Sequence, residues 1–284
     1  MVDLLQNELS KRLQNESTAK INWEVTERLS KEPKYVAFNK WCDDNGIRHP
    51  SVRYPTAFGK EGHLIGLSST RRIGFQESYI YVPSKVIICE DQFRNDPKIG
   101  HILDNHPEAF QTRISSDHLT VIFFVMTEMI KGEESFWAPY FAITEKTDMC
   151  QFWSEDELSN LQDEIMKAEA IDETDVLKDE FLIIYEIAAK YPNAIDISQF
   201  TFDVFLQAHT LVCTRCFGYS LPYLMIVPLA DCANHHTTDN QYEMFNSRIH
   251  RQGKQATTKE EEKFYFTHDK QRINFFKHFS EEGF

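Results

Sequence analysis

The spacing of hydrophobic residues predicts a helix early in the chain. Tyr35, Phe38, Trp41 and Cys42 recur at intervals of three and four residues, so their side chains fall on one face of a helix. Gly46 provides a C-terminal stop. Beyond this glycine the pattern changes to short segments rich in β-branched and aromatic residues, which indicates a passage from helix to strand.

Three strands are expected between residues 63 and 90. Their sequences are HLIGLSST, ESYIYVPS and KVIICED, and glycine and proline residues separate them. The intervening RRIGFQ is typical of a connecting turn. We therefore expect a small sheet in this part of the chain.

From residue 97 to residue 213 the pattern is mainly helical. Helices are expected from Ser116 to Gly132, after Ser154 with Glu157 in a capping box, over residues 175–190 before Pro192, and after Thr201. On the last helix Phe202, Phe205 and His209 fall on one side. Strand-rich and helix-rich segments without alternating βα units predict an α+β fold.

The charge balance bears on the kind of partner. The 284 residues include 44 acidic and 30 basic side chains, which give a formal net charge of -14. A field of this sign repels phosphate backbones, so we expect no nucleic-acid partner. It favours instead a protein partner, either a substrate or a member of an assembly.

The expected location is intracellular, either cytoplasmic or nuclear. The first residues alternate apolar and charged side chains and lack the apolar run of a signal peptide. The most apolar segment, residues 119–130, contains Glu128 and is too short to span a bilayer, so no membrane is expected as a partner. The six cysteines are scattered through a core-forming chain, which is typical of reduced thiols.

A polar cluster at residues 228–240, PLADCANHHTTDN, follows an apolar run and is the main candidate for chemistry. It is compatible with a metal site, a nucleophile with its base, or a ligand pocket. A nucleophilic Cys232 with His235 as its base would need oxyanion donors or a helix N-terminus beside the thiolate. No glycine-rich elbow flanks Cys232, so a buried structural cysteine is the simpler interpretation.

The same region argues against a metal. His235 and His236 are neighbours in sequence, so their side chains diverge in a strand or a helix. Cys213 and Cys216 form one CxxC pair without a second pair at a workable spacing. We therefore expect no metal at Cys213, Cys216, Cys232 or His235.

A ligand pocket remains. A strand IVPLAD that ends at Asp231 would deliver Asn234 and His235 to a strand-to-loop transition. An asparagine amide donates and accepts hydrogen bonds, which suits a zwitterionic ligand. The alternative is that Asn234 caps the loop and His235 packs in the core, and these residues alone leave both interpretations open.

Five segments in order resemble the SET-domain methyltransferases, in the branch that includes the Rubisco large-subunit lysine and actin-histidine methyltransferases. They are FNKWCDDNGI, EGHLIGLSSTRRIGFQESYIYVPSKVII, GEESFWAPYFAI, TRCFG and VPLADCANHH. Their order and spacing agree over residues 34–246. The resemblance implies a SET-like β core with a large helical insertion, and methyl transfer from S-adenosylmethionine to a protein lysine or histidine.

The resemblance also implies which residues would contact this cofactor. They are the backbone of Glu61, Gly62, His63 and Leu64, the side chains of Arg215 and Asn234, and the backbone of His235. The guanidinium of Arg215 would meet the α-carboxylate, and the amide of Asn234 would meet the α-ammonium. The backbone of His235 would meet the adenine.

Two departures from the family pattern concern the cofactor turn and the catalytic end. Gly62 and Gly66 are four residues apart, whereas the family places two glycines one residue apart. The family's last motif carries a tyrosine, but in FNSR (245–248) Arg248 stands in its place. We therefore assign no catalytic residue and expect residues 1–284 to be catalytically incomplete. The chain would belong to an active N-methyltransferase if the tyrosine motif lies beyond residue 284, and the alternative is a non-catalytic SET-like scaffold.

The expected domain organisation follows from this resemblance. It consists of N-terminal helices (1–53), the first part of the SET-like core (54–96), a helical insertion (97–199), the second part of the core (200–252) and a surface loop with an incomplete C-terminal end (253–284). The two core parts are expected to pack together, with Asn234 close to the HLIGLSST strand.

Overall fold

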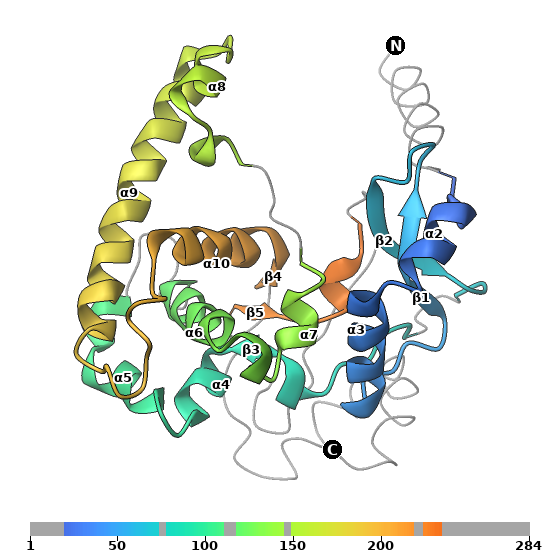
Figure 1. Ribbon diagram of the computed structural model, residues 1–284, viewed down its shortest axis with the longest axis horizontal. Helices are drawn as coiled ribbons and strands as arrows, with labels where there is room; N and C mark the ends of the chain where they lie inside the picture. Colours follow the sequence, from blue (N-terminus) through green and yellow to red (C-terminus); the bar gives the residue numbers. More distant parts are fainter. Residues whose placement is uncertain (1–19, 74–77, 111–117, 145–148, 219–223, 235–284) are drawn as a thin grey trace, which may run out of the picture. The chain divides into compact units, whose positions relative to one another are not determined.

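A computed structural model describes residues 20–73, 78–110, 118–144, 149–218 and 224–234 (Figure 1). The chain divides into two compact units, residues 1–83 with 228–284 and residues 84–227. Within the described ranges, no helix combines the length and apolar character needed to cross a bilayer. The expected loop at 253–284, His235 and the expected helix start at Ser116 lie outside these ranges.

The described part of the first unit begins with two helices, α2 (Trp23–Leu29) and α3 (Pro33–Asp44). The α3 helix is the one that the hydrophobic spacing predicts, and its four predicted core residues are buried. Its C-terminal end is followed by Gly46 at φ +82°, a left-handed conformation that glycine adopts without steric cost.

The first unit also contains a two-stranded antiparallel sheet of β1 (Val52–Phe58) and β2 (Leu64–Ser69). The β2 strand is the predicted HLIGLSST strand. The β1 strand was not predicted, because Pro55 lies inside it and proline cannot donate to a strand ladder. The pairing is irregular at this point, with a register shift between Arg53 and Thr56.

A second sheet lies in the second unit, with the order β3 (Ile88–Cys89), β5 (Met225–Ile226), β4 (Cys216–Phe217), and all its pairs are antiparallel. The predicted KVIICED strand is reduced to two residues because helix starts at Glu90. Of the predicted ESYIYVPS strand, the described part makes only an isolated bridge between Arg48 and Tyr81.

The predicted IVPLAD strand is wrong in its extent. The strand ends at Ile226, two residues before Pro228, which has no N–H to continue the ladder. A short 3₁₀ helix, η5 (Ala230–Cys232), then occupies the place of the expected strand end.

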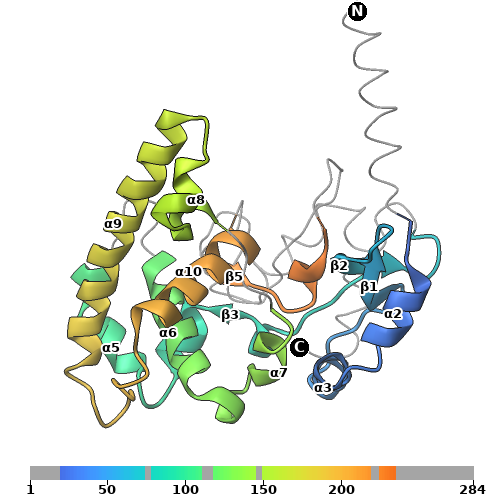
Figure 2. The same cartoon turned by 45° about the horizontal axis from the view of Figure 1, so that its top comes forward.

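The structure describes seven α-helices in the second unit (Figures 1 and 2). They are α4 (Glu90–Asn95), α5 (Gly100–Asn105), α6 (His118–Ile130), α7 (Ala138–Phe141), α8 (Glu155–Ser159), α9 (Glu164–Ala188) and α10 (Phe202–Arg215). Helices α4, α7 and α10 pack against α6. The α6 helix is buried from His118 to Glu128, as expected of a helix that is apolar on all sides. Both views place α10 directly beside it.

Two helix starts were predicted correctly from their caps. Ser154 and Glu157 form the reciprocal capping box of α8, and the Thr201 hydroxyl accepts from the backbone N–H of Val204 at the start of α10. The α9 helix is longer than the predicted 175–190 segment. It begins after Asp163, whose carboxylate accepts from two backbone N–H groups, and its first half lacks a continuous apolar face.

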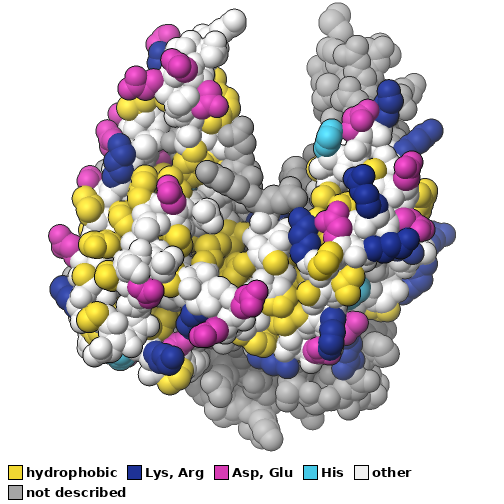
Figure 3. Space-filling view, in the orientation of Figure 1, with side chains coloured by type: hydrophobic (Ala, Val, Ile, Leu, Met, Phe, Trp, Pro, Cys, Tyr) yellow, Lys and Arg dark blue, Asp and Glu magenta, His cyan; other side chains and the backbone are white. Residues whose placement is uncertain are grey.

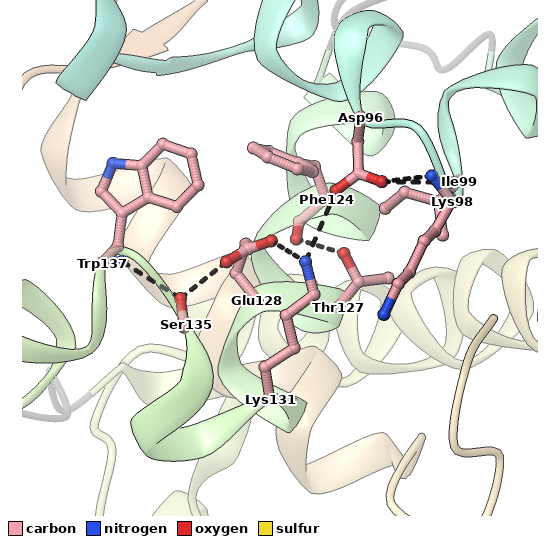
Figure 4. A network of polar contacts seen from close by, with 9 residues as sticks. All are labelled: Asp96, Lys98, Ile99, Phe124, Thr127, Glu128, Lys131, Ser135 and Trp137. Atoms are coloured by element: carbon pink, nitrogen blue, oxygen red, sulfur yellow. Dashed lines mark hydrogen bonds and ion pairs between the residues drawn. The ribbon is translucent and has the colours of Figure 1, made fainter.

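A buried polar network fixes the end of α6 (Figure 4). Glu128 is 3% exposed, pairs with Lys131 and accepts a hydrogen bond of 2.6 Å from the Ser135 hydroxyl. Lys131 also contacts Asp96 at 3.5 Å. The Trp137 indole donates to the carbonyl of Val86 at 2.9 Å. Because each buried charge has a partner, the GEESFW segment is held against α6 without an isolated buried ion.

Candidate cofactor site

The turn between β1 and β2 is shaped by two glycines in left-handed conformations. Gly59 has φ +82° and Gly62 has φ +70°. The Gly62 N–H donates to the Gly59 carbonyl at 3.2 Å, and the Asn22 amide donates to the Lys60 carbonyl at 2.9 Å. The turn is therefore tied both to itself and to the N-cap residue of α2.

Gly62 also lies close to α2. A Cβ on Gly62 would be 3.0 Å from three side-chain carbons of Val25, closer than nearly all real Cβ contacts. Gly62 is buried, whereas Glu61, His63 and Leu64 on either side are exposed. The four residues expected to meet a cofactor through their backbone thus form a surface turn with a rigid base.

Gly66 has a different function from Gly62. A Cβ on Gly66 would be 2.3 Å from Nδ2 and 3.1 Å from Oδ1 of Asn234. The Asn234 amide therefore lies directly on the backbone of β2, as expected for a loop that packs on the HLIGLSST strand. This explains the four-residue spacing of the glycines, because one forms the turn and the other makes room for the amide.

An unusual backbone geometry leads the chain to Asn234. Leu229 is fully buried and has φ 71° and ψ −43°, a conformation that a branched side chain rarely adopts. Its carbonyl accepts from the Cys232 N–H at 3.1 Å, which closes the turn of η5. Surrounding packing must hold such a residue in place, and strained turns of this kind cluster at ligand sites.

The environment of Asn234 bears on the two interpretations that the sequence left open. Asn234 is exposed. The loop that it would cap begins at residue 235, outside the described ranges, so the loop-capping interpretation stays untested beside the ligand interpretation. An exposed amide fixed on a strand can accept from an ammonium group and donate to a carboxylate.

Cys232 and Cys42 are buried thiols near Asp231. Cys232 is 6% exposed, and its thiol lies 3.7 Å from a carboxylate oxygen of Asp231. Burial raises the pKa of Cys42 to about 12, and Asp43 and Asp231 add to the shift. A protonated thiol is a poor nucleophile, so the raised pKa of Cys42 agrees with a structural role. The burial of Cys232 agrees with the structural interpretation of that cysteine.

Arg215 is the last residue of α10 and is half-buried. It stands directly before β4, whose residues pair with Met225 and Ile226. Arg215 belongs to the second unit, whereas the Gly62 turn and Asn234 belong to the first. Its role toward a cofactor, like that of His235, stays a prediction.

The sequence did not reveal the residues that pack against the Gly62 turn and the Asn234 loop and hold them in place. Asn22, Val25 and Leu229 fix the turn and the Asn234 loop through backbone contacts and close packing. The only sequence signal was Asn22 as the helix N-cap of α2, which would have placed a helix start beside the turn.

Comparison with models of protein families gives no match. Curated relatives are nevertheless similar over about three quarters of the chain. The actin-histidine N-methyltransferase of Xenopus tropicalis is 26% identical over 72% of this chain and 35% of its own length. The Rubisco large-subunit N-methyltransferase of Pisum sativum is 26% identical over 76% of this chain and 42% of its own length.

Solved structures agree with these relatives. The SET domain of LSMT bound to MeLysine and AdoHcy matches with a TM-score of 0.60 and 26% identity, over 74% of this chain and 46% of that chain. Rubisco LSMT bound to AdoMet matches with a TM-score of 0.56 and 25% identity, over 72% of this chain and 45% of that chain. The chain thus has a SET-like α+β fold, and the predicted fold class is confirmed.

The sequence and structure comparisons also point to one branch of the SET-domain methyltransferases. The chain is similar to the branch of SET-domain methyltransferases that includes the Rubisco and actin-histidine enzymes, as its motifs predict. It spans less than half the length of each of these relatives and of each of these solved chains.

Proposed function

We propose that the chain is the S-adenosylmethionine-binding part of a protein N-methyltransferase that acts on lysine or histidine. The observation that carries this proposal is the Asn234 amide, which lies on Gly66 of β2 beside the rigid Gly62 turn. The relatives named as actin-histidine and Rubisco N-methyltransferases, and the neighbours solved with AdoMet or AdoHcy, support it.

The donor groups of the described residues fit the polar end of this cofactor. Its α-ammonium requires an acceptor, which the exposed Asn234 amide oxygen provides, and its α-carboxylate requires a cation, which Arg215 would provide. The exposed turn from Glu61 to Leu64 offers backbone groups at a fixed position. When bound, the cofactor supplies the electrophilic methyl group, and the protein's part is to hold and orient it.

Slow turnover is part of the proposal. By the resemblance, the tyrosine of the family's last motif lines the methyl-transfer channel. The stretch FNSR (245–248) resembles that motif in part, but it comes too soon after Asn234 and has Arg248 where the tyrosine would be. Loss of a positioning wall costs on the order of 100-fold in rate, because transfer depends on alignment. We therefore expect weak cofactor binding and little methylation by the 284-residue chain.

Calorimetric titration of the chain with S-adenosylmethionine tests the binding. Asn234→Ala and Arg215→Ala should each weaken it about tenfold to a hundredfold, since each removes a hydrogen bond to a charged group. Asn95→Ala is the matched control, because Asn95 is exposed on α4 and its amide caps a local carbonyl. Binding that survives both site substitutions unchanged would refute the residue assignment.

A non-catalytic SET-like scaffold is the second candidate, and Arg248 in place of the tyrosine favours it. Transfer of labelled methyl groups to lysine- and histidine-bearing proteins distinguishes the two. Actin, the Rubisco large subunit and fructose-bisphosphate aldolase are the first to test, since the relatives are named for them. Cofactor binding without any transfer supports the scaffold, and efficient transfer refutes it.

A further inference from the structure

Three side chains that take no part in the candidate cofactor site meet between α6 and α10. His118 is the first residue of α6, and His209 and Cys213 lie one turn apart on α10. The Cys213 sulfur is 3.4 Å from Nε2 of His118 and 3.4 Å from Nε2 of His209. Their potential ligand atoms all lie within 4.8 Å of one another, the only such His, Cys and carboxylate group in the described ranges.

These distances match the spacing of ligands around one tetrahedral zinc ion. With Zn–S of about 2.3 Å and Zn–N of about 2.0–2.1 Å, tetrahedral angles separate sulfur from nitrogen by about 3.5 Å. The observed separations of 3.4 Å agree with this value for both imidazoles. The sulfur is thus placed correctly relative to both rings, and the ligand nitrogens of the two rings lie within 4.8 Å of each other.

The surroundings of His209 favour the form of this side chain that binds metals. His118 is 5% exposed and His209 is 3% exposed, and burial lowers the pKa of His209 to about 4, with His118 adding to the shift. His209 is therefore a neutral imidazole, which is the form that binds metals.

Of the three side chains, the Cys213 thiol is the one whose protonation a bound cation would change most. Although Cys213 as a residue is exposed, burial of its thiol raises its pKa to about 11, and Glu173 and Glu180 of α9 raise it further. The α9 helix carries eight acidic residues and two lysines, and acidic side chains line its surface in Figure 3. The same negative potential that disfavours the thiolate alone attracts a divalent cation, which stabilises it.

We propose that His118, His209 and Cys213 form a zinc site that joins the start of α6 to α10. Zinc takes nitrogen and sulfur ligands in this geometry, and the three side chains leave one tetrahedral position for a further donor. The proposal replaces the sequence-based expectation that Cys213 binds no metal. The competing explanation is a packed histidine pair, since the two rings meet edge to face at 5.6 Å.

Cobalt substitution distinguishes these explanations in the full 284-residue chain, prepared metal-free with reduced thiols. We expect one equivalent of Co²⁺ to bind, with sulfur-to-cobalt charge transfer and the strong visible bands of a tetrahedral ion, and Zn²⁺ to displace it. Cys213→Ser should abolish the charge-transfer band. His209→Gln should weaken binding about 100-fold or more, because even changes behind the ligands cost 10- to 100-fold.

Cys216→Ser is the matched control, since Cys216 is the other cysteine of the CxxC pair and lies outside the cluster. It should bind cobalt as the parent chain does, and far-ultraviolet circular dichroism should show that every variant is folded. Absence of stoichiometric tetrahedral cobalt in the parent chain would overturn the proposal. So would an unchanged spectrum in Cys213→Ser, or loss of the charge-transfer band in Cys216→Ser, which would indicate a CxxC site instead.

Discussion

The Asn234 region and the His118–His209–Cys213 cluster are built in opposite ways. At Asn234 the backbone makes the shape, through the left-handed Gly62, the bare Gly66 and the strained turn at Leu229. In the cluster, side chains of two regular helices meet, although His118 and Cys213 are 95 residues apart in sequence. One site depends on unusual backbone, the other on ordinary helix packing.

This difference determines what a sequence can reveal. A left-handed turn or a close backbone approach tolerates few residue types, so glycine and asparagine at such positions form a recognisable motif. A site between two helices needs only suitable side chains on the faces that meet. The sequence pattern of such a face does not differ from that of other helix faces. The two sites should therefore respond differently to substitution.

The largest effect is expected where the helix packing behind the cluster is removed. Phe205 is fully buried on α10, with its ring centroid 5.7 Å from that of Phe181 and 6.1 Å from that of His209. Phe205→Ala should lower the free energy of unfolding by about 3–5 kcal/mol in urea titrations, because it leaves a cavity. Half-buried Phe202 is the control, and an equal loss in Phe202→Ala would contradict this account.

Removal of zinc should have the next largest effect. If free zinc is held at about 100 times its Kd, its removal by a chelator should lower the free energy of unfolding by about 3 kcal/mol. Thermal unfolding with and without chelator measures this change. Cys213→Ser should be insensitive to the chelator, and a parent chain that is equally insensitive would show that the cluster binds no zinc.

Most helices could be predicted from the sequence, because their signals are local. The face of α3, the capping box at Ser154 and the N-cap at Thr201 each lie within a few residues of the helix that they define. The strands were harder to predict. Proline made both misses: Pro55 lies inside β1 and hid that strand, and the strand before Asn234 was predicted too long because it ends ahead of Pro228.

The two candidate sites also differ in how far the sequence predicted them. Gly62 and Asn234 were identified through a motif, and the structure adds why Gly66 stands four residues later. His209 was noted only as a residue on a helix face, Cys213 was considered only with Cys216 as a CxxC pair and expected to bind no metal, and His118 was not singled out. No local pattern connects α6 to α10, so only the folded structure could bring these three together.

A smaller effect is expected in the cofactor turn. Gly62→Ala places a side chain at φ +70°, which costs about 1–2 kcal/mol, and its methyl group would also press on Val25. Gly59→Ala is the control, because Gly59 has φ +82° but nothing within 4 Å of its added Cβ. In urea titrations Gly62→Ala should lose more stability than Gly59→Ala, and equal losses would rule out the Val25 contact as a cause.

Gly66→Ala should have the smallest effect on stability and yet impair the proposed function. Gly66 does not have a positive φ, so an alanine brings no backbone strain there, and the three atoms nearest its added Cβ all belong to the exposed side chain of Asn234. Although Gly66 is buried, the free energy of unfolding should change by less than about 1 kcal/mol, because the side chain that must move is exposed. The methyl group would nevertheless displace the Asn234 amide, so affinity for S-adenosylmethionine should fall about tenfold. In an Asn234→Ala background the same change should cost nothing further, because the two substitutions remove one interaction. Additive losses in the double variant would show instead that Gly66 acts on the cofactor independently of Asn234.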